Sequence, residues 1–397
     1  MSWINHNSAL FIKNQILNNR YRIFKKLINI NPPYSLYNNK KIINWSNNDY
    51  NGLVKNEELK SSLIEGINNF GCGSSGTRNI GGTNDIHEIL ESKVSELHKK
   101  QMGLIFNSGY LSNLSSMQAL GTIFPNGEFY SDEYNHNSLI YGMKLSKLKK
   151  NIFKHNDIDN LEYLLKKGNK NKKQKIIVLE SMYSIDGSIP FFDDIIYLKK
   201  KYDAMIFLDE IHAVGVHGNK GGGISELYNL TNDIDIIMGG FGKGYGLLGG
   251  YITGSNFLID AIRLCGAGFI FTTSLPPHII YGIMKSIDYN KKNIKHTQEK
   301  RKKLIQFFKK TAGEKNIPII DNNFSESQIQ SIIINDASKA EILHDLLLNK
   351  YNHYVQHLNY PTVSVGNERL RISIKSHHTE QMITDLLDKT SKILNIL

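Results

Sequence analysis

The sequence predicts an α/β fold in which a large domain with a mostly parallel sheet is joined to a smaller C-terminal α/β domain. A series of short, unbroken apolar runs indicates the sheet: residues 175–179 (KIIVL), 204–208 (AMIFL) and 234–238 (IDIIM). Such runs are typical of strands buried on both faces of a parallel sheet. Longer segments with helical spacing separate them, as in β–α–β units. We therefore expect ligands to bind beyond the carboxyl ends of these strands.

The length and composition restrict the class of protein. With 397 residues, 40% of them hydrophobic, the chain can form two domains or one large domain with additions. Cys72 and Cys265 lie far apart without metal-ligand spacing, which favours a reducing compartment and no metal site. The sequence has no signal peptide, apolar span of membrane length or Arg-rich transit peptide. We expect a cytoplasmic protein of bacterial type, or a mature organellar form, without a membrane partner.

The net charge of +11 raises the question of a nucleic-acid partner. Lysines cluster in residues 144–154, 166–175 and 292–310, which resemble helix faces and loops. These segments lack the interleaved aromatic residues of a single-strand platform and match no DNA-binding motif. We favour a basic surface that helps to attract an anionic substrate, and no nucleic-acid partner.

Acidic, imidazole and amine side chains follow three apolar runs. Glu180 ends the first run, Asp209 follows the second with His212 three residues later, and Lys243 lies in a glycine-rich loop after the third. A lysine between glycines has little steric cover and can form a Schiff base with a planar carbonyl compound. Asp209 has the type and position to keep a cofactor ring nitrogen protonated. Singly, a strand-end Asp is more often a helix cap, and Gly-Lys-Gly more often an exposed loop.

Four segments together point to a known family: ESMYSIDG (180–187), LDEIHAVG (208–215), GGFGKGYGLLGGY (239–251) and GFIFTTSLPP (268–277). They resemble the α-oxoamine synthases, which are fold-type I pyridoxal-phosphate enzymes, and within these the 5-aminolevulinate synthases most. The motifs keep the family's order from Arg20 to about Ser376. The resemblance implies a fold-type I transferase that forms a homodimer with shared active sites. It also implies an acyltransferase that condenses glycine with succinyl-CoA to 5-aminolevulinate, CoA and CO2, the first step of tetrapyrrole and haem biosynthesis.

The resemblance assigns a role to individual residues. It implies that Lys243 carries pyridoxal phosphate and acts as general base, that His212 bonds the phenolic oxygen, and that Asp209 bonds the ring nitrogen. Further cofactor contacts are implied for Gly109, Tyr110, His136, Glu180 and Ser184, and for Thr272 and Thr273 from the neighbouring subunit. Substrate contacts are implied for Arg22, Asn48, Thr77, Asn79, Ser131 and Arg371. Of these, Arg22 matches the residue for the succinyl carboxylate and Arg371 the one for the glycine carboxylate, where a bidentate pair is expected.

Some positions depart from the family pattern. Gly240 stands where a threonine usually contacts the cofactor phosphate, Asn137 replaces the usual alanine, and residues 373–376 (SIKS) replace a Thr-Pro stretch. A further motif, GCGSSG at residues 71–76, matches the dinucleotide fingerprint as a pattern. It follows an amphipathic helix instead of a strand, so we reject a Rossmann site.

We expect an N-terminal arm (1–44), a large cofactor-binding domain (45–285) and a smaller C-terminal domain (286–397). Two alternatives to the implied function stay open. One is a sister α-oxoamine synthase that uses acetyl-CoA (glycine C-acetyltransferase) or pimeloyl-CoA (8-amino-7-oxononanoate synthase). The other is a catalytically degenerate scaffold that only binds the cofactor, against which the intact Lys243, Asp209 and His212 speak.

Overall fold

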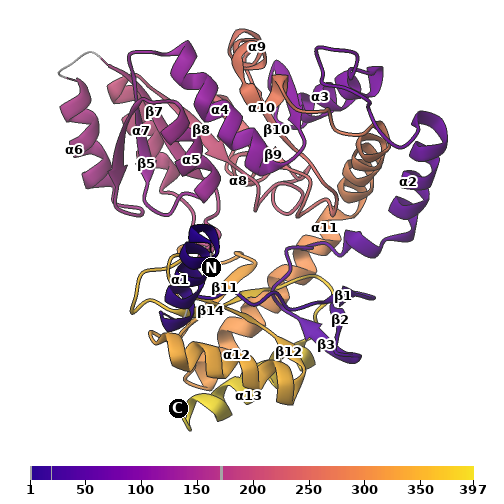
Figure 1. The fold of residues 1–397 in the computed structure, drawn as a ribbon, viewed down its shortest axis with the longest axis vertical. Coiled ribbons are helices and arrows are strands. Elements are labelled where there is room, and N and C mark those ends of the chain that lie inside the picture. Colours follow the sequence, from indigo (N-terminus) through magenta and orange to yellow (C-terminus); the bar gives the residue numbers. More distant parts are fainter. Residues whose placement is uncertain (1, 19, 170–172) are drawn as a thin grey trace. The chain divides into compact units, whose positions relative to one another are not determined.

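The computed structural model describes residues 2–18, 20–169 and 173–397 (Figure 1). By their internal contacts these residues form two compact units. One unit contains residues 48–301, and the other combines the chain up to residue 47 with residues 302–397. The expected domain boundaries at 44/45 and 285/286 differ from this division by contacts, and as boundaries of folding domains they stay predictions.

The larger unit is built around a seven-stranded sheet with the order β4-β10-β9-β8-β7-β5-β6. Strands β9, β8, β7, β5 and β6 pair in parallel, whereas β10 runs antiparallel to both of its neighbours. The mostly parallel sheet that the sequence predicts is therefore confirmed. The strands are β4 (Met102–Phe106), β5 (Gly127–Asp132), β6 (Lys149–Phe153), β7 (Gln174–Glu180), β8 (Ala204–Asp209), β9 (Ile236–Gly240) and β10 (Gly250–Gly254).

Helices connect and cover these strands (Figure 1). They are η1 (Leu53–Lys55), α2 (Glu57–Phe70), α3 (Asp85–Leu97), α4 (Gly109–Ile123), α5 (Asn137–Leu145), α6 (Ile158–Asn169), α7 (Phe192–Tyr202), α8 (Ile224–Leu227), η2 (Thr231–Asp233), α9 (Asn256–Cys265) and α10 (Ala267–Ile270). Side-chain caps fix several starts: Asn84 accepts from the backbone of α3, and Ser108 accepts from the N–H of Leu111 in α4. The lysine-rich segment 292–310 lies in the long helix α11 (Pro277–Glu314).

Apolar side chains fill both faces of the large sheet. Leu104 and Phe106 of β4 pack in one cluster with α4, α5, α9 and α10. Ile105, between them, packs in a second cluster with α3 and the first half of α11. Successive strand residues point to opposite faces, so a strand with helices on both sides is apolar throughout. This double burial is the physical reason for the unbroken apolar runs.

The smaller unit contains two small sheets with the orders β1-β2-β3-β12 and β11-β14-β13. Its core joins Trp45 to the second half of α11 and to α12, α13 and β14. The parallel pair of β3 with β12 ties the N-terminal segment to the C-terminal part of the chain. Its elements are α1 (Trp3–Leu17), β1 (Ile28–Asn29), β2 (Tyr34–Tyr37), β3 (Lys40–Asn44), β11 (Ile329–Ile333), α12 (Ala337–Tyr351), β12 (His353–Tyr354), β13 (Gln356–Leu358), β14 (Arg369–Ser373) and α13 (Glu380–Leu394).

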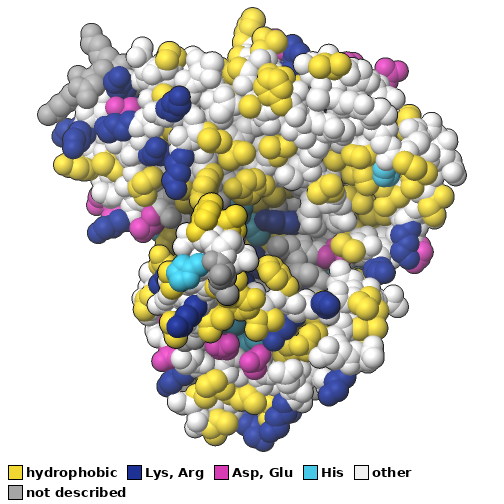
Figure 2. Space-filling view, viewed as in Figure 1, with side chains coloured by type: hydrophobic (Ala, Val, Ile, Leu, Met, Phe, Trp, Pro, Cys, Tyr) yellow, Lys and Arg dark blue, Asp and Glu magenta, His cyan; other side chains and the backbone are white. Residues whose placement is uncertain are grey.

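Basic side chains lie in several separate groups on the face seen in Figure 2. Of the lysine-rich segments noted above, residues 170–172 lie outside the described residues. None of the helices in the described ranges is both long and apolar enough to cross a membrane.

Candidate active site

Three neighbouring strands bring charged side chains together at their carboxyl ends. Glu180, the last residue of β7, pairs in register with Asp209, the last residue of β8. Next to β8 lies β9, and the loop after its last residue, Gly240, carries Lys243. His212 lies in the turn after β8. Because the carboxyl ends of parallel strands lie on the same side of the sheet, side chains distant in the sequence become neighbours here.

The amine of Lys243 stands at the head of a polar chain. Its Nζ lies 2.5 Å from Nε2 of His212, and Nδ1 of His212 lies 2.8 Å from the hydroxyl of Tyr50. The Tyr50 hydroxyl donates in turn to Oδ1 of Asn48 at 3.2 Å. With that hydrogen donated to Asn48, the imidazole donates from Nδ1 and accepts from the amine at Nε2. The chain therefore orients the imidazole toward the lysine.

A second polar chain holds the carboxylate of Asp209, which is 2% exposed. Its Oδ2 accepts from Nδ2 of Asn113 at 2.6 Å, and its Oδ1 accepts from the N–H of Ile211 at 2.9 Å. The same Nδ2 of Asn113 donates to Oγ of Ser138 at 3.0 Å, and this hydroxyl lies 2.7 Å from Nδ1 of His136. Asp209 and His136 are thus fixed by one network.

Burial and the neighbouring charges set the titration of this group. Burial raises the pKa of Glu180 well above its usual range, the Asp209 carboxylate raises it further, and Lys243 lowers it by less. Burial lowers the pKa of His136, with a smaller upward effect of Asp209 and a downward effect of Lys243. Both shifts favour the uncharged form of the side chain, the acid for Glu180 and the neutral imidazole for His136.

The start of α4 offers backbone donors next to this group. The Ser108 side chain caps the N–H of Leu111, while helix geometry leaves the N–H groups of Gly109 and Tyr110 without an acceptor inside the helix. The Tyr110 ring meets the His136 ring edge-on with centroids 6.2 Å apart. Its hydroxyl donates to Oδ1 of Asn137 at 3.2 Å, so the asparagine that replaces the family's usual alanine has a partner here.

The comparisons with known proteins identify the family. A model of the aminotransferase class I and II family matches residues 40–389. The 5-aminolevulinate synthase of Rickettsia prowazekii (strain Madrid E) is 47% identical over 373 residues, which cover 92% of this chain and 88% of the relative. The chain belongs to the 5-aminolevulinate synthase family. The 5-aminolevulinate synthase of Bradyrhizobium diazoefficiens is 37% identical over 377 residues, covering 93% of this chain and 90% of the relative.

Solved structures agree on the fold. Serine palmitoyltransferase from S. paucimobilis, solved with a bound PLP–myriocin aldimine, superposes with a TM-score of 0.91 at 23% identity and covers 100% of this chain and 99% of its own. The 8-amino-7-oxononanoate synthase of Francisella tularensis superposes with a TM-score of 0.77 at 25% identity, covering 89% and 98%. The fold-type I transferase fold predicted from the motifs is confirmed.

The residues at the strand ends fit the cofactor of this family. Pyridoxal phosphate needs an amine for its aldehyde, an acidic partner for its ring nitrogen and hydrogen-bond donors for its phosphate. Lys243, Asp209 and the start of α4 present these three kinds of group. Two buried oxygens beside Asp209, Oδ1 of Asn113 and Oε1 of Glu180, have no hydrogen-bond partner within the described part of the chain. A polar ligand at this edge would give such atoms the partners that buried groups require.

The loop with the predicted substrate residues Thr77 and Asn79 is tied to the segment with Thr272 and Thr273. Oγ1 of Thr77 donates to Oδ1 of Asn79 at 2.6 Å, and the backbone of Thr77 forms a β-bridge with Thr273. Next to this bridge, Oγ of Ser274 donates to the carbonyl of Gly82 at 2.6 Å. These contacts tie the loop to the segment within one chain, and the reach of the two threonines to a neighbouring subunit stays a prediction.

The structure places the other predicted site residues as follows. Ser131 is buried in β5, and its Oγ accepts from Nδ2 of Asn135 at 2.8 Å. Ser184 is half-buried in the turn after β7. In the smaller unit, Arg22 is exposed in an irregular segment, and Arg371 of β14 donates to Oγ of Ser373 at 3.2 Å. The roles of these four residues stay predictions.

Sequence reasoning missed two residues that touch the centre of the site. Tyr50 contacts His212 across 162 positions of sequence, and Asn113 contacts Asp209 across 96. Tyr50 lies two residues after Asn48, to which the resemblance assigns a substrate contact, so a signal existed nearby. Asn113 gave none, because one polar residue inside a helical segment is typical of an exposed helix face. No cluster of three or more His, Cys, Asp or Glu side chains suited to a metal ion occurs in residues 2–18, 20–169 and 173–397.

Proposed function

We propose that this protein condenses glycine with succinyl-CoA to 5-aminolevulinate, CoA and CO2, with pyridoxal phosphate held at the carboxyl ends of β7, β8 and β9. The observation that carries the proposal is the contact of Lys243 Nζ with His212 Nε2 at 2.5 Å beside the buried Asp209 carboxylate. The family relationship over 92% of the chain supports the reaction.

Three parts of the site would hold the cofactor. Lys243 would bind it covalently, Asp209 would bond its ring nitrogen, and the N–H groups of Gly109 and Tyr110 would donate to its phosphate. His136 would lie against the ring, and Ser184 would line the pocket beside it. When bound, pyridoxal phosphate supplies an electron-withdrawing ring that stabilises negative charge at Cα of glycine. The carboxylate of Asp209 would keep the proton on the ring nitrogen, assisted by the network through Asn113.

Lys243 would also move the proton. Once glycine has taken its place, the free Nζ can accept the proton from Cα of glycine as a general base. His212 Nε2 would hold Nζ in position, and Tyr50 and Asn48 would hold the imidazole. Glycine Cα would then bond to the thioester carbonyl carbon of succinyl-CoA as the C–S bond breaks, and CoA would leave as a thiolate that takes a proton from solvent. The bond between Cα and the glycine carboxyl carbon would then break to release CO2, and Cα would take back the proton held on Nζ of Lys243. The raised pKa of Glu180 favours its protonated form, which would add no second negative charge beside Asp209.

Substrate contacts follow the family resemblance. Arg371 would pair with the glycine carboxylate, and Arg22 with the terminal carboxylate of the succinyl group. Thr77, Asn79, Asn48 and Ser131 would add hydrogen bonds. Arg22 and Arg371 share one unit, and the cofactor residues belong to the other. The two arginines supply the kind of charge-assisted pair that a dicarboxylate intermediate requires.

We also propose a homodimer with shared sites in the cytoplasm of a bacterial-type cell. Thr272 and Thr273 would reach the cofactor phosphate of the neighbouring subunit. The side chains of Phe257 and Phe271 are 92% and 80% exposed, which supports burial against another copy of the chain.

The test is product identification with purified protein and pyridoxal phosphate. Glycine with succinyl-CoA should yield 5-aminolevulinate, and acetyl-CoA and pimeloyl-CoA should react far more slowly. A preference for either of those thioesters would assign a sister reaction. Bound cofactor without turnover on any of the three would indicate a scaffold.

A further inference from the structure

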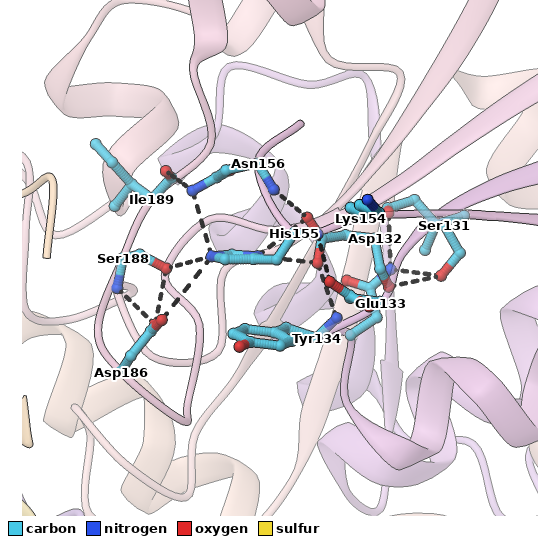
Figure 3. A network of polar contacts seen from close by, with 12 residues as sticks. Ser131, Asp132, Glu133, Tyr134, Lys154, His155, Asn156, Asp186, Ser188 and Ile189 are labelled. Carbon is cyan, nitrogen blue, oxygen red and sulfur yellow. Dashed lines mark hydrogen bonds and ion pairs between the residues drawn. The ribbon is translucent and has the colours of Figure 1, made fainter. Parts of the chain in front are cut away.

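His155 joins the ends of three adjacent strands through one imidazole (Figure 3). It lies in the loop after β6, and its Nδ1 lies 3.0 Å and 3.1 Å from the two carboxylate oxygens of Asp132, the last residue of β5. Its Nε2 lies 2.9 Å from Oγ of Ser188, in the loop after β7. Because β5 lies between β6 and β7 in the sheet, the ring spans three strand ends. We name the four residues His155, Asp132, Ser188 and Asp186 the His155 clamp.

The ring itself is held on its face and at its side. The Tyr134 ring stacks on it with centroids 4.2 Å apart and planes 11° apart. The Tyr183 ring meets it at 82° with centroids 4.5 Å apart. The side chain of His155 is only 15% exposed. An imidazole packed in this way has one orientation, so its two nitrogens fix the distance between the two loops that they contact.

Both partners of the imidazole are themselves built into their loops. The Asp132 carboxylate also accepts the N–H of Tyr134 at 2.8 Å and the N–H of Asn156 at 3.1 Å. Ser188 donates its hydroxyl to Oδ1 of Asp186 at 2.7 Å. The carboxylate and the hydroxyl that contact the imidazole therefore also hold the turns around them.

The two loops carry residues of the proposed active site. The first, counted with the end of β5 as residues 131–137, holds Ser131 and His136, and the second, counted with the end of β7 as residues 180–189, holds Glu180 and Ser184. Tyr183, whose ring meets that of His155, belongs to the second of these loops and lies three residues after Glu180.

We propose that His155 is a positioning residue that sets the spacing of these two loops, and with it the placement of His136 and Ser184 around cofactor and substrate. The inference rests on the proposed function, because it gives those two residues their roles. A histidine suits the task since it bonds on two opposite sides of one rigid ring. The alternative is that His155 contributes only to the stability of the fold.

The test compares three substitutions of His155 with a control. His155→Phe keeps the flat ring beside the two tyrosines and removes the hydrogen bonds of both ring nitrogens, including the 3.3 Å contact of Asn156 Nδ2 with Nε2. His155→Asn keeps a donor near the position of Nδ1, for Asp132, and His155→Gln keeps one near the position of Nε2, for Ser188. The control is His98→Phe, which removes the 2.8 Å bond of another buried histidine to the Tyr251 hydroxyl, away from both loops.

The expected result is a specific loss. His155→Phe should raise KM for succinyl-CoA or glycine, or lower kcat, by tenfold or more and shift the absorption band of the bound cofactor. It should also speed amide hydrogen exchange in residues 131–137 and 180–189. His98→Phe should lower the melting temperature comparably and change none of these. His155→Asn should restore slow exchange in the first loop only, and His155→Gln in the second only.

Contrary results are equally definite. If all three variants kept kinetic constants within twofold of wild type and an unchanged cofactor spectrum, His155 would be merely structural. The same would follow if His98→Phe lost as much activity as His155→Phe. Failure of the proposed function itself shows in the wild-type protein, which would make no 5-aminolevulinate. In that case the cofactor spectrum and the exchange of the two loops still decide the role of His155.

Discussion

A Cβ atom placed on Gly240 would lie 2.7 Å from Cγ1 and 2.9 Å from Cδ1 of Ile211. A Cβ atom on Gly109 would lie 2.4 Å from the same Cδ1. The Ile211 side chain therefore fills the space between the end of β9 and the start of α4. The threonine usual in the family at position 240 has no room while Ile211 is present, which gives the departure at Gly240 a steric reason.

This packing predicts a coupled pair of substitutions. Gly240→Thr should lower the free energy of unfolding by about 1–3 kcal/mol, because overpacking forces neighbouring atoms apart. Adding Ile211→Ala should relieve most of that loss, with a coupling of about 1 kcal/mol or more in a double-mutant cycle. Urea unfolding of the four proteins measures the coupling. Strictly additive effects would show that Ile211 does not exclude the threonine.

Asp209→Asn should reduce turnover on the order of 10²-fold or more while cofactor still binds, because the loss of a fixed charge at a reacting centre has an effect of this size. Glu210→Gln is the matched control: this neighbouring carboxylate is fully buried but accepts from the N–H groups of Ile224 and Ser225 at α8. The control should lose stability and keep cofactor-dependent turnover per folded molecule. Near-normal activity of Asp209→Asn would mean that another acid holds the ring nitrogen.

Glu180 should make the larger unit less stable as pH rises. Burial first, and then Asp209, raise its pKa in the folded chain well above the ordinary 4.5. The unfolded chain therefore loses this proton at lower pH, so the stabilising effect is complete below 4.5 and declines as pH rises toward the folded-state pKa. Glu180→Gln removes the titration. Its free energy of unfolding, relative to wild type, should increase as pH rises above 4.5 in urea titrations, and a constant difference would exclude a proton on Glu180.

Arg22→Leu should raise KM for succinyl-CoA, leave glycine nearly unaffected and shift preference toward uncharged thioesters by roughly ten- to a hundredfold, the equivalent of one charge-assisted hydrogen bond of about 1.5–3 kcal/mol. Arg371→Leu should do the opposite and impair glycine. Arg20→Leu is the control. Arg20 lies in the same segment as Arg22, and its guanidinium carbon lies 4.0 Å from the centroid of the Tyr360 ring. If Arg22→Leu ranks the thioesters as Arg20→Leu does, Arg22 is a surface residue and the succinyl assignment loses its main support.

The parallel strands and the side chains at their ends were predictable because each depends on local sequence. An apolar run of five residues indicates a strand that is buried on both faces. The residue after it, such as Asp209 or Glu180, lies at the carboxyl end of the strand, where ligands bind, whatever the order of the strands in the sheet. Antiparallel β10 was not predicted. Its sequence, GYITG, contains three residues with side chains between two glycines and has no length or pattern that separates it from a loop.

The supports of the site were less accessible. Tyr50 and Asn113 act through contacts that only the folded chain creates, and the identity of their partners is absent from any local pattern. The same holds for Ile211, whose effect on Gly240 depends on the packing of β9 against α4. The N-terminal segment pairs with the C-terminal part of the chain through β3 and β12. This long-range pairing could not be predicted from the sequences of two short strands.

The most direct test of the account is reduction of the protein with borohydride in the presence of pyridoxal phosphate, followed by tryptic peptide mapping. Modification at Lys243 blocks cleavage there, so the account predicts the cofactor mass on an uncleaved peptide spanning residues 221–263. Lys243→Arg should abolish this label, whereas a change at the buried Lys375 of the smaller unit should not. Label on another lysine of the wild-type protein, with normal cleavage after Lys243 into peptides 221–243 and 244–263, would contradict the central role of Lys243.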